Sequence, residues 1–372
     1  MVGEWISSTF WVIGSLAALF AALYWGGGAL AAMLEGVWGR WGSAAVAAAV
    51  GRTMGRGLAA RIVLWGLDGG VQALISVGIP YVLAYYLVFA VLQETGVVAR
   101  VAAAADRLLV RTGLSATPSL PLVMAAGCNV PALLALRALP GGSTRIVAGT
   151  LVTLVPCGAR TAVIFGTVGA ALGAGWAAAL YGVVAAVLVG TGGLLRVFFP
   201  TARLSPPPPG SLRCPSARAV TRTVAAAARE FLFGAAPAVM AGSLALGALY
   251  ETGAIRLAAR PLSPVVEGWL LLPPAAGLTL LCAMLRKELA VQLLTALGTM
   301  TGVPAGAGLR EWLTPAQIFT YALVNTLALP CLATVGVLAR VVGTARAAAV
   351  VGLGLGMAVL LGGAAARLLA AL

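Results

Sequence analysis

The sequence predicts an all-α, polytopic membrane protein of about 8 to 10 transmembrane helices. Of its 372 residues, 61% are hydrophobic and only 9% are charged, and the mean hydropathy is +1.02. A soluble domain carries about a quarter of charged residues, so this excess of apolar residues cannot be buried in one core. Long charge-free runs recur along the chain, and helices are the open-chain structure that satisfies backbone groups in lipid. A soluble enzyme and a DNA-binding protein are both excluded.

Each predicted span is a charge-poor run of the length that crosses a bilayer, about 20 residues. No basic segment precedes the first run, so it is expected to remain a membrane helix rather than to be removed as a signal peptide. The net charge of +14 comes from arginines in the connections, where they contact anionic lipid headgroups rather than nucleic acid. We expect a multi-pass protein of a bacterial or archaeal plasma (inner) membrane. The predicted spans are residues 6–30, 71–92, 118–139, 146–170, 174–198, 230–250, 269–298, 315–339 and 347–369.

A segment rich in proline and arginine divides the chain into two long parts. Thr201–Arg229 contains the run Pro206–Pro209, which favours an extended and hydrated polyproline helix. The predicted domains are an N-terminal transmembrane helix with its connection (1–64), a first repeat (65–200), the linker (201–229), and a second repeat with a C-terminal helix (230–372).

Short matches in the same order indicate that the two long parts are internal repeats. The tripeptide Glu94–Gly96 recurs as Glu251–Gly253, and each copy closes an apolar run. The pair Pro156–Cys157 recurs as Pro330–Cys331. Transporters built from repeats place their sites near the bilayer midplane, where helices are broken. Breaks in the apolar runs are therefore the places where a site is expected.

The first such break is predicted at the tract Gly-Cys-Asn-Val-Pro. Pro131 has no backbone N–H and clashes with the carbonyl four residues earlier, so it frees the carbonyl of Gly127. The thiol of Cys128, the amide of Asn129 and this carbonyl then meet within one turn, at a depth where lipid cannot solvate them. The alternative is a packing kink without a site.

Two further cysteines lie beside a proline within an apolar run, and each directly follows that proline. Cys157 precedes Arg160 in the same apolar run, and Cys331 comes shortly after Asn325. A single buried cysteine is usually a small hydrophobic residue. Three cysteines beside helix breaks in matching halves indicate ligands instead.

A charged tract interrupts the second half at the position that matches the first Cys-Asn-Pro break. It consists of Arg286, Lys287 and Glu288, and Lys287 is the only lysine of the chain. Charges at the depth of the hydrocarbon cost several kcal/mol unless they are paired or face a wet cavity, so they are candidates for function. The alternative is a short cytoplasmic loop between two helices.

The chain contains no histidine, so metal binding would rely on sulfur and oxygen. The thiols of Cys128, Cys157 and Cys331 with the carboxylate of Glu288 suit a borderline divalent transition metal better than Mg²⁺ or Ca²⁺. The competing hypothesis is an anionic substrate held by Arg160, Arg286 and Lys287. The residues expected to line the pathway are Gly127, Asn129, Pro131, Arg160, Arg286, Lys287 and Asn325.

Enzymatic activity is not expected. The single lysine does not follow a glycine, so the sequence contains no phosphate-binding loop of the Gly-Lys-Ser/Thr type. Paired carboxylates and a Ser-His-Asp constellation are also missing from the sequence.

Several tracts in order resemble the membrane region of the FeoB family of ferrous iron transporters. The similarity is most specific at the Gly-Cys-Asn-Val-Pro-Ala core, and it runs from about residue 65 to 345. The tracts that carry it are Leu67–Gly70, Leu92–Ser115, Ala125–Leu139, Pro156–Thr161, Met284–Val291 and Pro330–Arg340.

This resemblance implies two Gate-type repeats around a pathway for Fe²⁺, with Cys128, Cys157 and Cys331 as ligands and Glu288 as a charged element. Fe²⁺ is then the transported ion, and no cofactor is permanently bound. No tract resembles that family's N-terminal GTPase domain, so a separate GTPase subunit acting in trans is a candidate partner. We expect membrane lipid around the protein and no nucleic acid as a partner. A second copy of the chain, forming a homo-oligomer, is a further candidate partner. The alternatives are a nucleoside or organic-anion carrier of the Gate fold and a membrane scaffold that transports nothing.

Overall fold

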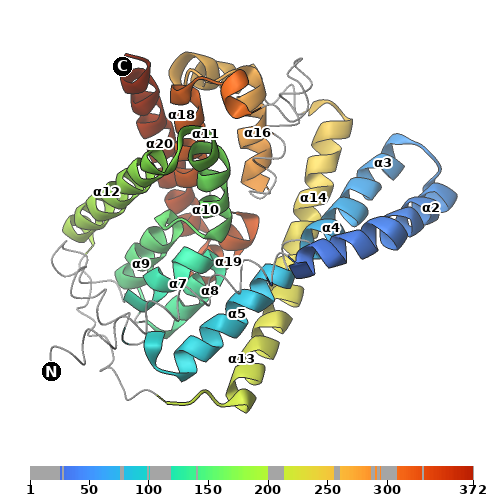
Figure 1. Cartoon of the computed structure of the whole chain (residues 1–372), viewed down its shortest axis with the longest axis horizontal. Coiled ribbons are helices and arrows are strands. Elements are labelled where there is room, and N and C mark those ends of the chain that lie inside the picture. Colours follow the sequence, from blue (N-terminus) through green and yellow to red (C-terminus); the bar gives the residue numbers. More distant parts are fainter. Residues whose placement is uncertain are drawn as a thin grey trace. The chain divides into compact units, whose positions relative to one another are not determined.

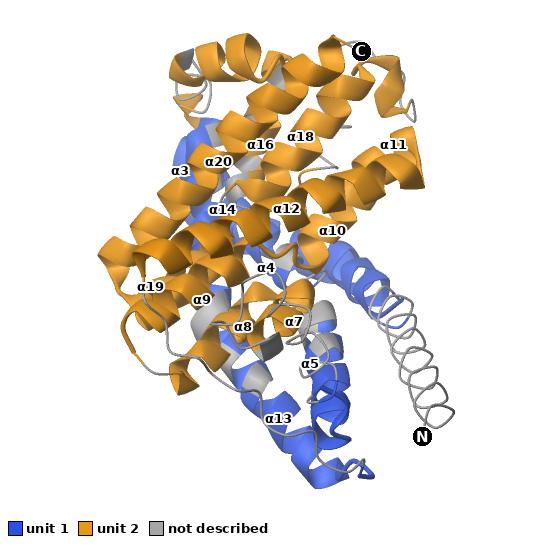
Figure 2. Ribbon diagram, turned by 90° about the vertical axis from the view of Figure 1, so that its left-hand side faces the viewer, with its two compact units in different colours: residues 1–104, 206–251 blue, residues 105–205, 252–372 orange. Residues whose placement is uncertain are grey.

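The computed structural model describes residues 26, 29–75, 79–98, 100, 119–139, 141–199, 213–254, 260–285, 290, 294, 308–328 and 331–371. This part of the chain is built of helices and turns and contains no β-strand, which confirms the all-α prediction. It forms two compact units, coloured separately in Figure 2. Unit 1 comprises Met1–Ala104 and Pro206–Glu251, and unit 2 comprises Ala105–Ser205 and Thr252–Leu372.

Unit 1 begins with helices where the sequence predicted a connection. Two helices, α2 (Ser43–Met54) and α3 (Leu58–Leu64), turn back on each other at Gly55, whose φ of 71° lies in the left-handed region that glycine tolerates (Figure 1). Arginines such as Arg52 interrupt the apolar run here, so residues 31–64 carried no signal of a membrane span. The other described elements of unit 1 are η1 (Trp38–Gly42), η2 (Trp65–Gly69), α4 (Gly70–Ala73), α5 (Ile79–Glu94), α13 (Ala217–Glu230), η6 (Phe231–Ala235) and α14 (Ala236–Glu251).

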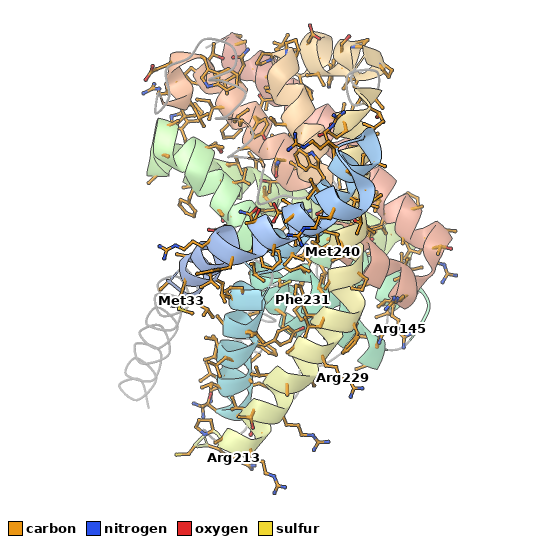
Figure 3. The ribbon with its side chains drawn as sticks, turned by 90° about the vertical axis from the view of Figure 1, so that its right-hand side faces the viewer. Met33, Arg145, Arg213, Arg229, Phe231 and Met240 are labelled. Atoms are coloured by element: carbon orange, nitrogen blue, oxygen red, sulfur yellow. The ribbon has the colours of Figure 1, made fainter. Side chains whose placement is uncertain are left out.

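The predicted linker over 201–229 ends earlier than expected. Residues 201–212 lie outside the described part, and helix α13 begins at Ala217 and packs against α5. Val220 is buried in this packing, whereas Arg229 is exposed, so α13 is amphipathic. Figure 3 shows how this helix runs through Phe231 into the apolar helix α14.

Glycines let α14 approach α3 and η2 closely. A side chain at Gly247 would collide with the ring of Trp65, and one at Gly66 would collide with Leu244. The indole Nε1 of Trp65 donates to a Glu251 carboxylate oxygen at 3.2 Å, and Nε of Arg61 donates to the other oxygen at 2.7 Å. Helix α14 is therefore held by packing along its length and by polar contacts at its end.

Replacing Gly247 by valine is expected to destabilise the protein by about 1–3 kcal/mol, because the new methyl groups overlap Trp65. The matched control is Gly51→Val in α2, where a side chain meets open space and only helix propensity changes. Thermal unfolding in detergent measures both variants. Equal losses of stability would contradict this packing.

Unit 2 contains four helical segments that are long and apolar enough to cross a membrane within the described residues. They are Ser143–Leu172, Ala174–Phe198, Pro315–Val342 and Thr344–Ala370, which confirms the spans predicted at 146–170, 174–198, 315–339 and 347–369. The remaining predicted spans lie wholly or partly over shorter helices or outside the described residues. The protein is a multi-pass membrane protein.

Residues from both sides of the predicted linker share the core of unit 2. Ile164 and Leu180 from the earlier part pack in one cluster with Leu272, Tyr321 and Leu323 from the later part. This shared core brings the two parts together at the site described below. The described elements of unit 2 are α7 (Ser119–Gly127), α8 (Asn129–Ala135), η4 (Leu136–Ala138), α9 (Ser143–Leu154), α10 (Gly158–Ile164), η5 (Phe165–Gly169), α11 (Ala170–Leu172), α12 (Ala174–Phe198), η7 (Arg260–Leu262), η8 (Pro264–Trp269), α16 (Pro274–Leu285), η9 (Leu309–Glu311), α18 (Pro315–Leu327), α19 (Leu332–Val342) and α20 (Thr344–Ala370).

The two copies of the Glu-Thr-Gly tripeptide both end a helix. Helix α5 ends at Glu94 and α14 ends at Glu251, and each is followed by a glycine with positive φ, Gly96 at 77° and Gly253 at 70°. A left-handed glycine just beyond the last turn is a common helix stop. The copies thus share a local structure, while the wider internal repeat and the domain limits drawn from it stay predictions.

Candidate ion pathway at three helix breaks

Three cysteines of unit 2 each lie immediately before a helix, at a point where the backbone is extended. Cys128 separates α7 from α8, with φ −149° and ψ 131°. Cys157 precedes α10 with φ −77° and ψ 172°, and Cys331 precedes α19 with φ −58° and ψ 156°. The predicted interruptions at these cysteines are therefore confirmed, and Figure 1 shows the helices on either side of them.

The first break lies within the predicted Gly-Cys-Asn-Val-Pro tract, but Pro131 does not cause it. Pro131 belongs to the first turn of α8, where a backbone N–H needs no helical partner, so it does not interrupt a running helix. The chain departs from helical geometry at Cys128, three residues before that proline. The carbonyl oxygen of Gly127 lies 3.3 Å from the position that a Cβ atom of Gly158 would take, so the first and second breaks meet.

The three thiols are free and partly buried, and they belong to three different helix starts. The sulfur of Cys331 also lies 3.0 Å from the hydroxyl of Thr334 in the first turn of α19. Within the described ranges, no three Cys, Asp or Glu side chains form a group that could hold a metal ion. The cysteines do not build a closed metal site by themselves, and their role as ligands stays a prediction.

Arg160 is the largest fully buried side chain of this region, with 1% of its surface exposed. Its Nη1 donates to the carbonyl oxygens of Thr153 at 2.6 Å and Val155 at 3.3 Å, at the end of α9. Its Nη2 donates to the carbonyl oxygen of Ala328 at 3.3 Å, at the end of α18. The guanidinium thus joins the ends of two helices, each of which leads into a cysteine.

Both predicted asparagines are buried, with 3% exposed surface each, in helices next to the breaks. Asn129 is the first residue of α8 and follows Cys128 directly. Its Oδ1 accepts no hydrogen bond from any residue that the structure describes. An amide oxygen in that position is available to a passing ligand. Asn325 lies in the last turn of α18, among the buried residues that precede Cys331.

The charged tract Arg286, Lys287 and Glu288 lies outside the described residues, directly after α16. Its predicted place in the pathway therefore stays a prediction.

Two features of the site were not predicted from the sequence. One is the cluster of backbone carbonyls around Arg160, which has no side-chain signature. The other is Gly158, whose missing side chain lets the carbonyl of Gly127 approach. A glycine directly after the cysteine of a Pro-Cys pair was the available signal for the second.

Residues 75–171 and 232–345 match the family described as Gate: Nucleoside recognition, and together they make up more than half of the chain. The chain belongs to the Gate family. All three helix breaks fall in the matched residues, with Cys128 and Cys157 in the first segment and Cys331 in the second. The family assignment therefore covers the site itself.

Among curated proteins, this Gate-family chain is similar to bacterial iron transporters. It is 33% identical over 99 residues to the Fe(2+) transport protein A/Fe(2+) transporter FeoB fusion protein of Porphyromonas gingivalis, which covers 27% of this chain and 12% of that protein. It is 32% identical over 130 residues to the Fe(2+) transporters FeoB of Salmonella typhimurium and Escherichia coli K12, covering 34% of this chain and 17% of theirs. The chain thus matches less than a fifth of the length of these relatives. No solved structure matches it.

Proposed function

We propose that unit 2 carries Fe²⁺, or a similar divalent transition metal, across the membrane along the three helix breaks. The observation that carries this proposal is the placement of Cys128, Cys157 and Cys331, each at the start of a helix that follows a break. A packing kink needs no sulfur, and three separate kinks need no contacts between them such as those of Gly127 with Gly158 and of Arg160 with the ends of α9 and α18. The similarity to proteins named Fe(2+) transporter supports the choice of ion.

The chemistry of the site suits transit rather than storage. Thiol sulfur and amide oxygen, here from the cysteines and Asn129, favour a borderline dication over Mg²⁺ or Ca²⁺. A conducting site must bind strongly enough to admit the ion and weakly enough to release it. Sulfur ligands that are not gathered into a closed group meet this requirement, because the ion exchanges one sulfur for the next. In this proposal Fe²⁺ is the substrate and no cofactor stays bound.

The charged tract and the partners belong to the same proposal. Glu288 lowers the cost of bringing a dication into the hydrocarbon region, and Arg286 and Lys287 lie beside it in the sequence. A separate GTPase subunit acts in trans on this membrane protein. The wider FeoB resemblance supports that partner.

A second candidate is a nucleoside carrier, because the Gate family is described by nucleoside recognition. The buried amide oxygen of Asn129, which has no donor among the described residues, would accept a hydrogen bond from the amino group of a base. In that case the cysteines are small hydrophobic residues and their replacement by serine leaves transport unchanged.

Uptake into proteoliposomes separates these functions. With purified protein and a downhill gradient under reducing conditions, we expect saturable entry of radioactive Fe²⁺ that Cd²⁺ inhibits and Mg²⁺ does not. Protein-free liposomes give the background. Saturable entry of a labelled nucleoside without entry of Fe²⁺ would replace the first proposal by the second, and entry of neither would favour a scaffold.

A further inference from the structure

The buried guanidinium of Arg160 lies in a cradle of backbone carbonyls. Its partners are the oxygens of Thr153 and Val155 on one side and of Ala328 on the other, at 2.6, 3.3 and 3.3 Å. These oxygens come from the ends of α9 and α18, which belong to the earlier and the later part of unit 2. None of these three oxygens belongs to a side chain.

The ends of two interrupted helices normally form a place for a hard cation. The last carbonyls of a helix carry a partial negative charge because they have no helical partners. In transporters with broken helices, such unwound carbonyls and helix ends coordinate Na⁺ or H⁺. Carbonyl oxygens are also preferred ligands of Ca²⁺. In this protein the cation among these carbonyls is the guanidinium of Arg160, which belongs to the chain itself.

Arginine is well suited to fill such a cradle. Its planar fork carries five N–H donors and no acceptor, and it stays charged under all conditions found in proteins. Here Nη1 donates hydrogen bonds to carbonyls at the end of α9, and Nη2 donates one to a carbonyl at the end of α18. The Nε group of Arg160 has no hydrogen-bond partner among the described residues. Within this part of the chain, the hydrogen bonds to the three carbonyls alone orient the guanidinium.

The cradle adjoins the thiols. The two helix ends that the guanidinium joins lead into Cys157 and Cys331, which precede α10 and α19. No carboxylate in the described ranges forms an ion pair with it. An incoming cation therefore meets a fixed positive charge, occupied carbonyls and free sulfur.

We propose that Arg160 is the specificity-determining residue of the pathway, because its guanidinium occupies the carbonyl cradle of α9 and α18 and so removes these oxygens as ligands for hard cations. Ions that gain little from sulfur, such as Ca²⁺, then have no compensation for the repulsion by Arg160. Ions that bind thiols well, such as Cd²⁺ and Fe²⁺, are compensated for this repulsion by the cysteine sulfur. This inference rests on the proposed transport of metal ions through unit 2.

The test compares uptake of Cd²⁺ and Ca²⁺, a soft and a hard dication of similar size, by the full chain in proteoliposomes. We expect Arg160→Ala to lower the ratio of Cd²⁺ to Ca²⁺ uptake by about tenfold or more, because the carbonyls become available to Ca²⁺. Millimolar guanidinium should refill the cradle and restore the ratio. A loss of packing alone would not respond to guanidinium.

The matched control is Arg145→Ala. Arg145 also donates to carbonyls, those of Arg137 and Leu139, but these do not precede a cysteine. Its replacement should leave the ratio unchanged. If Arg160→Ala yields no monodisperse protein, Arg160→Gln takes its place, since glutamine is uncharged and too short to join both helix ends, and it should also lower the ratio.

The outcomes separate the two proposals. Wild-type protein that moves neither Cd²⁺ nor Fe²⁺ contradicts the proposed function. Wild-type protein that moves Cd²⁺, together with an Arg160 variant of unchanged ratio, overturns the role of Arg160 and leaves metal transport standing.

Discussion

Replacing Cys128, Cys157 and Cys331 together by serine is expected to reduce Fe²⁺ uptake by about 100-fold or more. The substitution keeps size and hydrogen bonding nearly constant but exchanges sulfur for a hard oxygen ligand. These cysteines lie before α8, α10 and α19, at breaks that the two parts of unit 2 bring together. The loss should fall on Fe²⁺ and Cd²⁺ alike, because both depend on sulfur. Initial uptake rates in proteoliposomes measure it.

The same chain contains the control for this experiment. Cys214 is a free and exposed cysteine in unit 1, ahead of α13, and has no place in the pathway. Cys214→Ser should keep the wild-type rate. Each single variant of the three pathway cysteines should lose part of the activity. Full activity in the triple variant, with stability unchanged, would remove sulfur from the mechanism.

The second large effect is expected from Gly158→Val. The carbonyl oxygen of Gly127 lies 3.3 Å from the place of the new Cβ atom, so either this carbonyl or the start of α10 has to move. Both groups adjoin a cysteine, Cys128 in one break and Cys157 in the other. We expect Fe²⁺ uptake to fall by about tenfold or more, since small displacements of ligands are costly at a functional site.

Gly175→Val is the matched control for that variant. Gly175 also lies in the first turn of a helix of unit 2, α12, but a side chain there meets open space. The two variants therefore change helix propensity in the same way and differ only in what the new side chain touches. Comparable uptake by both would show that the first two breaks need no close approach.

The membrane spans and the breaks were predictable because they depend on local sequence. Charge-free runs of sufficient length predicted the spans around α9, α12, α18 and α20. The Gly-Cys-Asn-Val-Pro and Pro-Cys tracts predicted the interruptions. The first break lies inside its predicted tract, at Cys128, but Pro131 is not its cause, because this proline is accommodated in the first turn of α8.

Features that depend on tertiary contacts could not be predicted in this way. Helices α2 and α13 contain arginines, so neither reads as an apolar run, although both are regular helices. The partners of Arg160 are backbone oxygens from residues far apart in the sequence, and any residue type supplies such an oxygen. From the sequence alone, Arg160 was a candidate for holding an anionic substrate. Its hydrogen-bond partners among the described residues are all backbone carbonyls.

X-ray absorption of the metal-loaded protein shows directly whether cysteine sulfur binds the transported ion. The sample is the full chain with Cys214 and Cys282 replaced by serine, so that Cys128, Cys157 and Cys331 are the remaining thiols. Zn²⁺ is a suitable redox-inert probe, with a zinc–sulfur distance of about 2.3 Å. We predict at least one sulfur atom at that distance. A ligand shell made only of oxygen and nitrogen would contradict sulfur coordination of the transported ion.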